Sequence, residues 1–136
     1  MAALKLPIRL IFAIAAGIVA SKGLDVLCHW LLHLAHVLPP LSEPNFSVRD
    51  QVIILSFHSF FTIISALITA AIARSDAQRA TSILGTKEAI FWLIGMVLLW
   101  NHNPFWVNIA KAVLGPPLCW IGGKIWQLRS SGSPQA

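Results

Sequence analysis

Charged residues are scarce in this chain of 136 residues, because lysine, arginine, aspartate and glutamate together make up only 11% of it. A soluble domain usually carries about a quarter charged residues. Hydrophobic residues make up 57%, and the mean hydropathy is +0.74. So few polar side chains cannot cover a globule in water. We therefore expect one transmembrane domain over residues 1–128 and a flexible C-terminal tail over residues 129–136.

Other features are lacking too, and each absence excludes a class of protein to which the chain could belong. The net charge of +5 is not gathered into a basic cluster, which argues against nucleic acid as a partner. The two cysteines, Cys28 and Cys119, do not make a disulfide framework. The first twenty residues imitate a signal peptide, but Ile18 stands where cleavage near Ala20 needs a small residue. We therefore assign them to a first membrane span.

Strict alternation of apolar and polar residues is also missing, so the apolar segments are expected to be helices. Only helices and closed barrels satisfy the backbone in lipid. The sequence thus predicts an all-α fold, a bundle of four transmembrane helices that run up-down-up-down. The expected segments, separated by polar or proline-containing stretches, are about residues 8–37, 51–73, 87–100 and 105–126. The third is short for a span and is expected to take in residues of the loop before it.

Lysine and arginine predict the orientation of this bundle. Arg49 alone falls in the loops at one side, whereas Lys22 and Lys111 lie within spans. The remaining seven of ten lie on the side of the two termini: Lys5, Arg9, Arg74, Arg79, Lys87, Lys124 and Arg129. Since cytoplasmic segments carry the excess of positive charge, both termini are predicted to be cytoplasmic.

The stretch KGLDVLCHWLLHLAH, residues 22–36, places a polar stripe on the first span. At 100° per residue, five of its side chains fall within roughly an 80° arc of a helix: Lys22, Asp25, His29, His33 and His36. A stripe of this kind must face protein or water. The predicted topology brings every histidine of the chain into the outward half of the bundle: His29, His33, His36, His58 and His102.

These histidines leave three interpretations open. Imidazole binds zinc, copper and haem iron and titrates near neutrality, so they are candidates for contact with a haem, a chlorin or a metal, or for a proton or solute path. They are also consistent with a structural or interfacial role, which is the more common one for histidines near a membrane interface. The motifs HExxH, CxxC and CxxCH are absent, and the cofactor stays unknown. Asp25 is expected to form an intramembrane charge pair with Lys22 or with Lys111.

Small residues predict where helices approach closely. Ser65 and Ala66 in the second span, and Gly122 and Gly123 in the fourth, are assigned to helix packing. Residues 116–117, both proline, are expected to kink the fourth helix.

Several of these pieces together resemble a known family. They are Asp25 and His29 before residues 37–40 (VLPP), a small-residue helix ending at residues 70–74 (AAIAR), and residues 117–124 (PLCWIGGK). The chain thereby resembles a family of small bacterial four-helix membrane proteins without an assigned function, although Phe57-His58-Ser59 replaces that family's Tyr-Arg-Thr. The resemblance implies a multi-pass protein of the bacterial inner (cytoplasmic) membrane.

For function, we expect a non-catalytic accessory or structural subunit of a larger membrane complex of the photosynthetic or respiratory type. Its partners would be membrane lipids and other membrane protein subunits. The alternative is a small oligomeric transporter or channel. An enzyme is not expected, because Cys28 and His29 are adjacent on a helix, point about 100° apart and cannot form a nucleophile–base pair.

Overall fold

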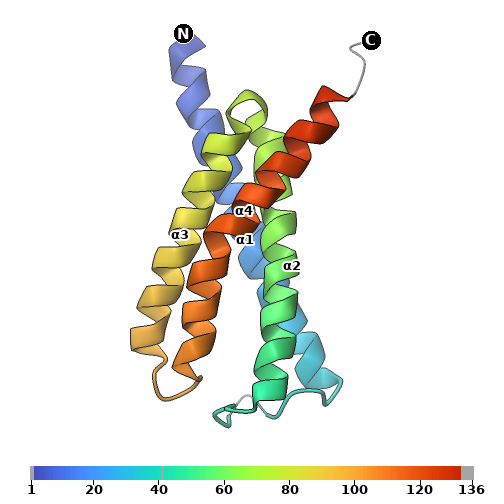
Figure 1. Cartoon of the computed structure of the whole chain (residues 1–136), viewed down its shortest axis with the longest axis vertical. Helices are drawn as coiled ribbons and strands as arrows, with labels where there is room; N and C mark the ends of the chain where they lie inside the picture. The colour runs from blue at the N-terminus through green and yellow to red at the C-terminus, as the bar shows by residue number, and fades with distance from the viewer. Residues whose placement is uncertain (1, 41, 133–136) are drawn as a thin grey trace.

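Residues 2–40 and 42–132 are described in a computed structural model, and over these residues the chain is all-helical and contains no strand (Figure 1). The expectation of an all-α fold is therefore confirmed. The elements are, in order, α1 (Ala2–Leu34), α2 (Val48–Ala73), a 3₁₀ turn (Arg74–Asp76), α3 (Ala77–Leu98) and α4 (Phe105–Ser131). Within the described part, two helical stretches are long and apolar enough to cross a membrane, Ile8–Leu34 and Val48–Leu98. The second stretch takes in α2, the turn and α3.

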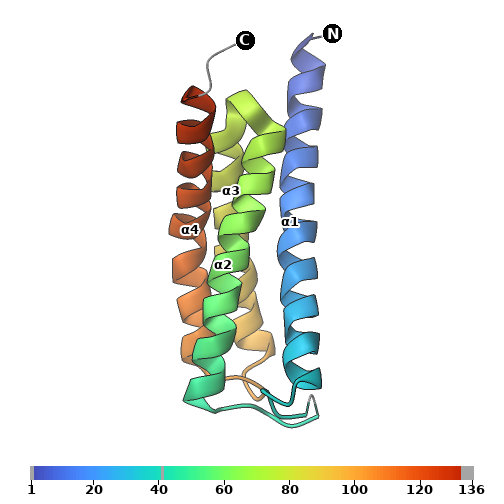
Figure 2. The same cartoon turned by 90° about the vertical axis from the view of Figure 1, so that its right-hand side faces the viewer.

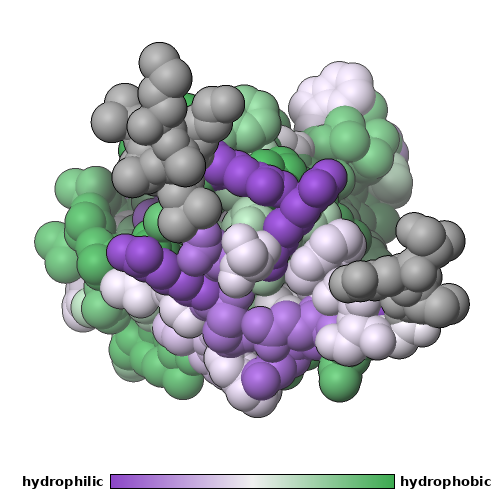
Figure 3. Space-filling model, turned by 90° about the horizontal axis from the view of Figure 1, so that it is seen from above, coloured by the Kyte–Doolittle hydropathy of each residue, from purple (hydrophilic) through white to green (hydrophobic). Residues whose placement is uncertain are grey.

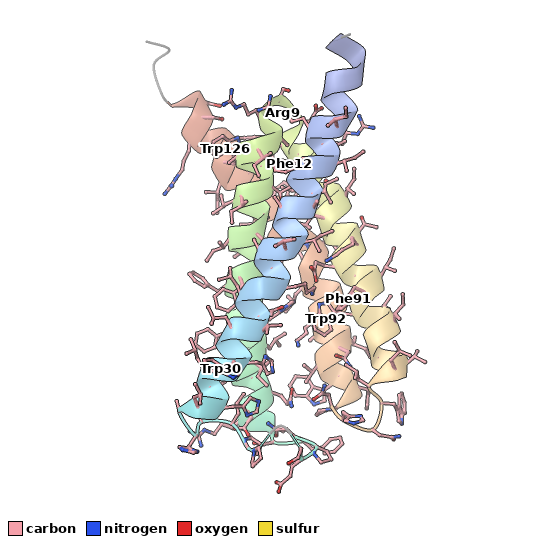
Figure 4. All side chains as sticks on the ribbon, turned by 180° about the vertical axis from the view of Figure 1, so that it is seen from behind. Arg9, Phe12, Trp30, Phe91, Trp92 and Trp126 are labelled. Atoms are coloured by element: carbon pink, nitrogen blue, oxygen red, sulfur yellow. The ribbon has the colours of Figure 1, made fainter. Side chains whose placement is uncertain are left out.

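The helices lie side by side along the long axis, with both termini at one end (Figures 1 and 2). The connection between α2 and α3 lies at this same end, and the other two connections lie at the opposite end. The most extensive contacts of α4 are with α3 and α2, and α1 packs mainly on α2. The contact between α1 and α3 is much smaller, because the distance between these two helices increases toward the end opposite the termini (Figure 4).

The third helix begins ten residues before the expected start near residue 87, and it takes in residues of the preceding loop, as expected from the shortness of the predicted segment. Arg74, with φ 53°, ends α2, and α3 begins at Ala77 almost at once. The stretch reads as a loop because polar residues are frequent in it, yet its buried positions recur at helical spacing. These buried positions are Ala77, Ala80, Thr81, Leu84, Gly85 and Glu88.

The ends of the other helices also differ from the prediction. The helix α1 stops at Leu34, and His36, with φ 55°, belongs to the turn that follows. At the C-terminus, α4 continues through Arg129 to Ser131, so the predicted tail is helical at its start, and residues 133–136 lie outside the described part. The helix α4 contains both prolines at 116–117, and Figure 1 shows it bending between its two halves.

The polarity of the molecule is reversed relative to a water-soluble domain. Apolar side chains face outward, with Val26, Val97 and Leu98 each about 70% exposed. The buried interior is instead rich in small and polar side chains, among them Gln51, His58, Thr62, Ser65, Thr69, Thr81, Glu88, Asn108 and Lys111. Hydrophilic side chains also gather on the end where the termini lie (Figure 3).

Candidate functional site: a buried charge cluster

Glu88 of α3 is the centre of a group of buried charges. Its side chain is 1% exposed, and it meets Lys22 of α1, with Nζ 3.2 Å from Oε2, and Lys87, with Nζ 2.7 Å from Oε1. Ser21 Oγ donates a weaker hydrogen bond of 3.4 Å to Oε1. A carboxylate removed from water needs such donors, because its desolvation costs several kcal/mol, of the order of the penalty for any buried ion.

A second contact between ionisable side chains lies nearer the opposite end. Asp25 follows Lys22 by three residues on α1, and its Oδ2 lies 2.9 Å from Nδ1 of His58 in α2. The His58 side chain is 3% exposed, so this contact is largely shielded from solvent. The pair fixes α1 against α2 in the same way as Lys22 and Glu88 fix α1 against α3.

Trp92 joins both of these contacts to α4. Its Nε1 donates a hydrogen bond of 3.1 Å to Glu88 Oε2, and its ring lies edge-on to the His58 ring, with centroids 5.2 Å apart. The ammonium groups of Lys22 and Lys111 lie 4.7 Å and 4.0 Å from the centroid of this ring. An indole face attracts cations, so the ring holds two of them close together.

We define the buried charge cluster as these six ionisable side chains, which come from α1 to α4: Lys22, Asp25, His58, Lys87, Glu88 and Lys111. His58, Glu88 and Lys111 are buried, and the other three are half-buried. Local sequence explains how they meet. On α4 the buried face repeats as Val107, Asn108, Lys111, Ala112 and Gly115, which is helical spacing. On α3, Glu88 continues the buried row that starts at Ala77.

Lys111 differs from the other cations of the cluster. It is only 7% exposed, yet among the described residues no carboxylate oxygen lies within 4 Å of it. Its ammonium group lies over the face of Trp92. Asn108, three residues earlier and 1% exposed, has a side-chain Nδ2 without a hydrogen-bond partner. A buried cation without an anion is costly, so this position is the least satisfied part of the cluster.

A cavity of about 420 Å³ adjoins the cluster where α1 and α3 diverge. Figure 4 shows Phe91 and Trp92 beside this space. Its polar lining is Lys22, Asp25, Cys28, His29, His33 and Lys111. The rest of the lining is apolar: Val26, Trp30, Leu32, Ile54, Phe57, Phe91 and Trp92.

The charge pairs differ from those expected from the sequence. Asp25 was expected to pair with Lys22 or Lys111, but in the structure Asp25 meets His58, and Lys22 meets Glu88. Sequence reasoning missed Glu88 and Trp92, because the dipeptide Lys87-Glu88 was placed at the start of a span. The signal for Glu88 was the helical spacing that links it to Leu84 and Thr81.

The predicted histidine site is divided among several places. His29 and His33 lie one turn apart with ring centroids at 6.1 Å, and both line the cavity. With His102 they also border a smaller cavity of about 210 Å³, whereas His58 is engaged with Asp25 and His36 lies in the turn after α1. Among the described residues, no three histidine, cysteine, aspartate or glutamate side chains are grouped so as to hold a metal ion.

The small residues assigned to packing lie at two interfaces of α4. A Cβ added to Gly122 would lie 2.5 Å from Cβ of Ala66 in α2, and one added to Gly123 would lie 2.5 Å from Oγ1 of Thr81 in α3. Ser65 is 1% exposed beside Ala66, and its hydroxyl donates to the Thr62 carbonyl oxygen. These contacts bring α4 against α2 and α3 in the half of the molecule nearer the termini.

Comparison of the chain with protein-family models, with curated proteins and with solved structures finds no match.

Proposed function

We propose that this chain is an integral membrane protein whose helices α1, α2, α3 and α4 each cross the bilayer, in an up-down-up-down bundle. The observation that supports this is the reversed polarity, with a buried row of charges and an outer surface of large apolar side chains. In water that surface would drive aggregation, whereas in lipid it is solvated. Because the sequence resembles that of small bacterial membrane proteins, we propose the bacterial inner membrane as the location of this chain.

The proposed orientation has both termini in the cytoplasm. Exposed basic side chains in the half that carries the termini support it: Arg9, Arg74, Arg79, Lys124 and Arg129. Arg49, in the first turn of α2, belongs to the opposite end. Lys5 lies outside the residues whose side chains are described, and Lys87 belongs to the buried charge cluster, so neither contributes to this argument.

Cysteine accessibility tests this orientation. In a Cys28→Ala/Cys119→Ala background, we expect Ser42→Cys to react with a membrane-impermeant maleimide in intact bacterial cells. Ser75→Cys and Ser130→Cys, which lie at the other end, should react only after the membrane is permeabilised. All three serines are exposed, so accessibility reports sidedness rather than burial. Equal labelling of Ser42→Cys and Ser130→Cys in intact cells would contradict the proposal.

Within the membrane, we propose the role of a non-catalytic accessory subunit of a larger complex, of the respiratory or photosynthetic kind. The single observation that carries this proposal is that most of the buried charges join one helix to another, Lys22 to Glu88 and Asp25 to His58. Charges used in this way stabilise a fixed helical module. A shallow apolar groove on the outer face of α3, lined by Ile83, Ile90 and Ile94, supports contact with a helix of a partner subunit.

The alternative, a small oligomeric transporter, has less support. The charges and the cavity lie in one half of the molecule, and a path would have to continue through the half nearer the termini. There the small side chains of Ala13, Ala73 and Ala80 let the helices pack closely. A side chain on Gly17 would collide with Thr69. We therefore favour a module that is closed toward the termini.

Native gel electrophoresis tests the accessory role. We expect the tagged full chain, solubilised from native membranes with a mild detergent, to migrate within a larger protein complex. Ile90→Trp fills the groove of α3 and should release the chain from it. Val113→Trp adds the same bulk to an exposed position of α4 outside that groove and is the matched control. Migration of the wild-type chain alone would overturn the proposal.

A further inference from the structure

We propose that the cavity between α1 and α3 binds a single-chain carboxylate amphiphile, such as a fatty acid, with its carboxylate on Lys111. This cavity lies next to the groove proposed for a partner subunit, and Phe91 lines both. The cavity holds about 420 Å³, within the range of roughly 300–1,000 Å³ that is typical of small-molecule sites. Its lining combines charged and apolar side chains, and an amphiphile requires both.

Charge balance indicates an anion. The cluster holds three ammonium groups, on Lys22, Lys87 and Lys111, against two carboxylates, on Asp25 and Glu88. Glu88 is shared by the first two ammonium groups, and Asp25 is engaged by His58. Lys111 is left more than nine-tenths buried, lines the cavity and has no carboxylate within 4 Å among the described residues. A bound carboxylate would supply the missing negative charge.

The other ionisable groups on the cavity wall suit the same ligand. His29 and His33 of α1 face the cavity and can donate hydrogen bonds to a carboxylate. Cys28 adds a weakly polar thiol. Asp25 is the one acidic group on this wall, and its contact with His58, at 2.9 Å, turns its charge toward α2.

Apolar side chains provide the surface for the chain of the ligand. Phe57 of α2 and Trp30 of α1 are 42% and 56% exposed, and Val26 is 69% exposed, although all three line the cavity. The cavity is therefore open along the outer surface, where α1 and α3 diverge (Figure 4). In a bilayer this opening faces the acyl chains, so an amphiphile can enter sideways from lipid.

The depth of the cations favours a single-chain ligand over a phospholipid. Lys111 lies six residues from the start of α4, about 9 Å along the helix, and Lys22 lies twelve residues before the end of α1, about 18 Å. A phospholipid would have to draw its glycerol and both chains below the headgroup level to bring a phosphate there. A single-chain carboxylate needs to insert only one narrow headgroup.

Quenching of tryptophan fluorescence tests the inference, because Trp30 and Trp92 line the cavity. The full chain in a non-ionic detergent is titrated with a brominated fatty acid and, separately, with its methyl ester. We expect saturable quenching by the acid and only weak, non-saturating quenching by the ester. In Lys111→Met the dissociation constant for the acid should rise at least about tenfold, as expected when a buried ion pair loses one charge. Lys111→Arg should retain binding.

Two further variants keep the result interpretable. Lys124→Met is the matched control. Lys124, like Lys111, is a lysine of α4 that lies over an indole ring, with its Nζ 5.5 Å from the Trp120 centroid. Unlike Lys111, it is exposed and lies outside the cavity. This variant should bind as the wild type does. If Lys111→Met does not fold, Val26→Trp narrows the apolar part of the cavity from an exposed position and should weaken binding without changing any charge.

Three results would overturn the inference. The first is equal quenching by the acid and by its methyl ester. The second is a Lys111→Met variant that folds and binds as tightly as Lys124→Met. The third is an alkyl phosphate of the same chain length that binds at least tenfold more tightly than the carboxylate, which would assign the site to a phosphate headgroup instead.

Discussion

Replacement of Glu88 by leucine is expected to cause the largest loss of stability of any single substitution in the buried charge cluster. It leaves Lys22 and Lys87 without the carboxylate that they share, and it removes the acceptor for the indole of Trp92. Removing one partner of a buried ion pair typically costs about 3–5 kcal/mol, because the other charge stays buried without compensation. We expect the apparent melting temperature in detergent to fall by roughly 10 °C or more.

The measurement is the fraction of monodisperse protein that remains after heating, read by size-exclusion chromatography. Glu43 is the only other glutamate in the chain and is exposed, so Glu43→Leu is the matched control and should melt as the wild type does. Glu88→Gln keeps an acceptor oxygen but loses the charge, and should fall between the two.

A second substitution separates the charge effect from simple loss of packing. Adding Lys22→Met to Glu88→Leu removes a cation that has lost its anion, so we expect the double variant to melt higher than Glu88→Leu alone. If the double variant melts lower, by the sum of the two single effects, Lys22 and Glu88 are not coupled. A wild-type melting temperature for Glu88→Leu would contradict the central role of this carboxylate.

The sequence predicted the α1 wall of the cavity well, and it predicted the partners of Lys22 and Asp25 poorly. The stripe of residues 22–36 placed Lys22, Asp25 and His29 on one face of a helix, and the structure has all three lining one cavity. Periodicity within one helix is enough for that prediction, because a helix fixes which side chains share a face. It says nothing about what the face meets.

The partner of Lys22, Glu88, lies far away in the sequence, and the contact between them depends on where α3 begins. Lys22 and Glu88 are 66 residues apart, and their contact depends on whether residues 77–86 form a helix or a loop. Composition favoured a loop, because Gln78, Arg79 and Ser82 are polar, whereas burial of the small residues between them favours a helix. Local propensity agrees with the helix, because alanine, glutamine and arginine are good helix formers, whereas the prediction of a loop followed hydropathy alone.

Close approach of helices is the second feature with a large expected effect. Gly122→Val should strongly destabilise the fold, because even the first carbon of a side chain would lie 2.5 Å from Cβ of Ala66 and 3.0 Å from the carbonyl oxygen of Ile63. Neither group can rotate away, so α4 would have to move off α2. Overpacking of this kind typically costs about 1–3 kcal/mol and sometimes more. Gly23→Val is the matched control, because a Cβ on Gly23 of α1 meets nothing within 4 Å.

An exchange of one methyl group across this interface tests the contact directly. Gly122→Ala alone should lower the melting temperature, and Gly122→Ala combined with Ala66→Gly should recover most of the loss, because the added carbon on α4 then replaces the one removed from α2. The contact with the Ile63 oxygen remains, so recovery is expected to be incomplete. Strictly additive effects of the two substitutions would mean that Gly122 and Ala66 do not touch. That result would also remove the reason for regarding the half nearer the termini as closed, and with it the argument against a path through the molecule.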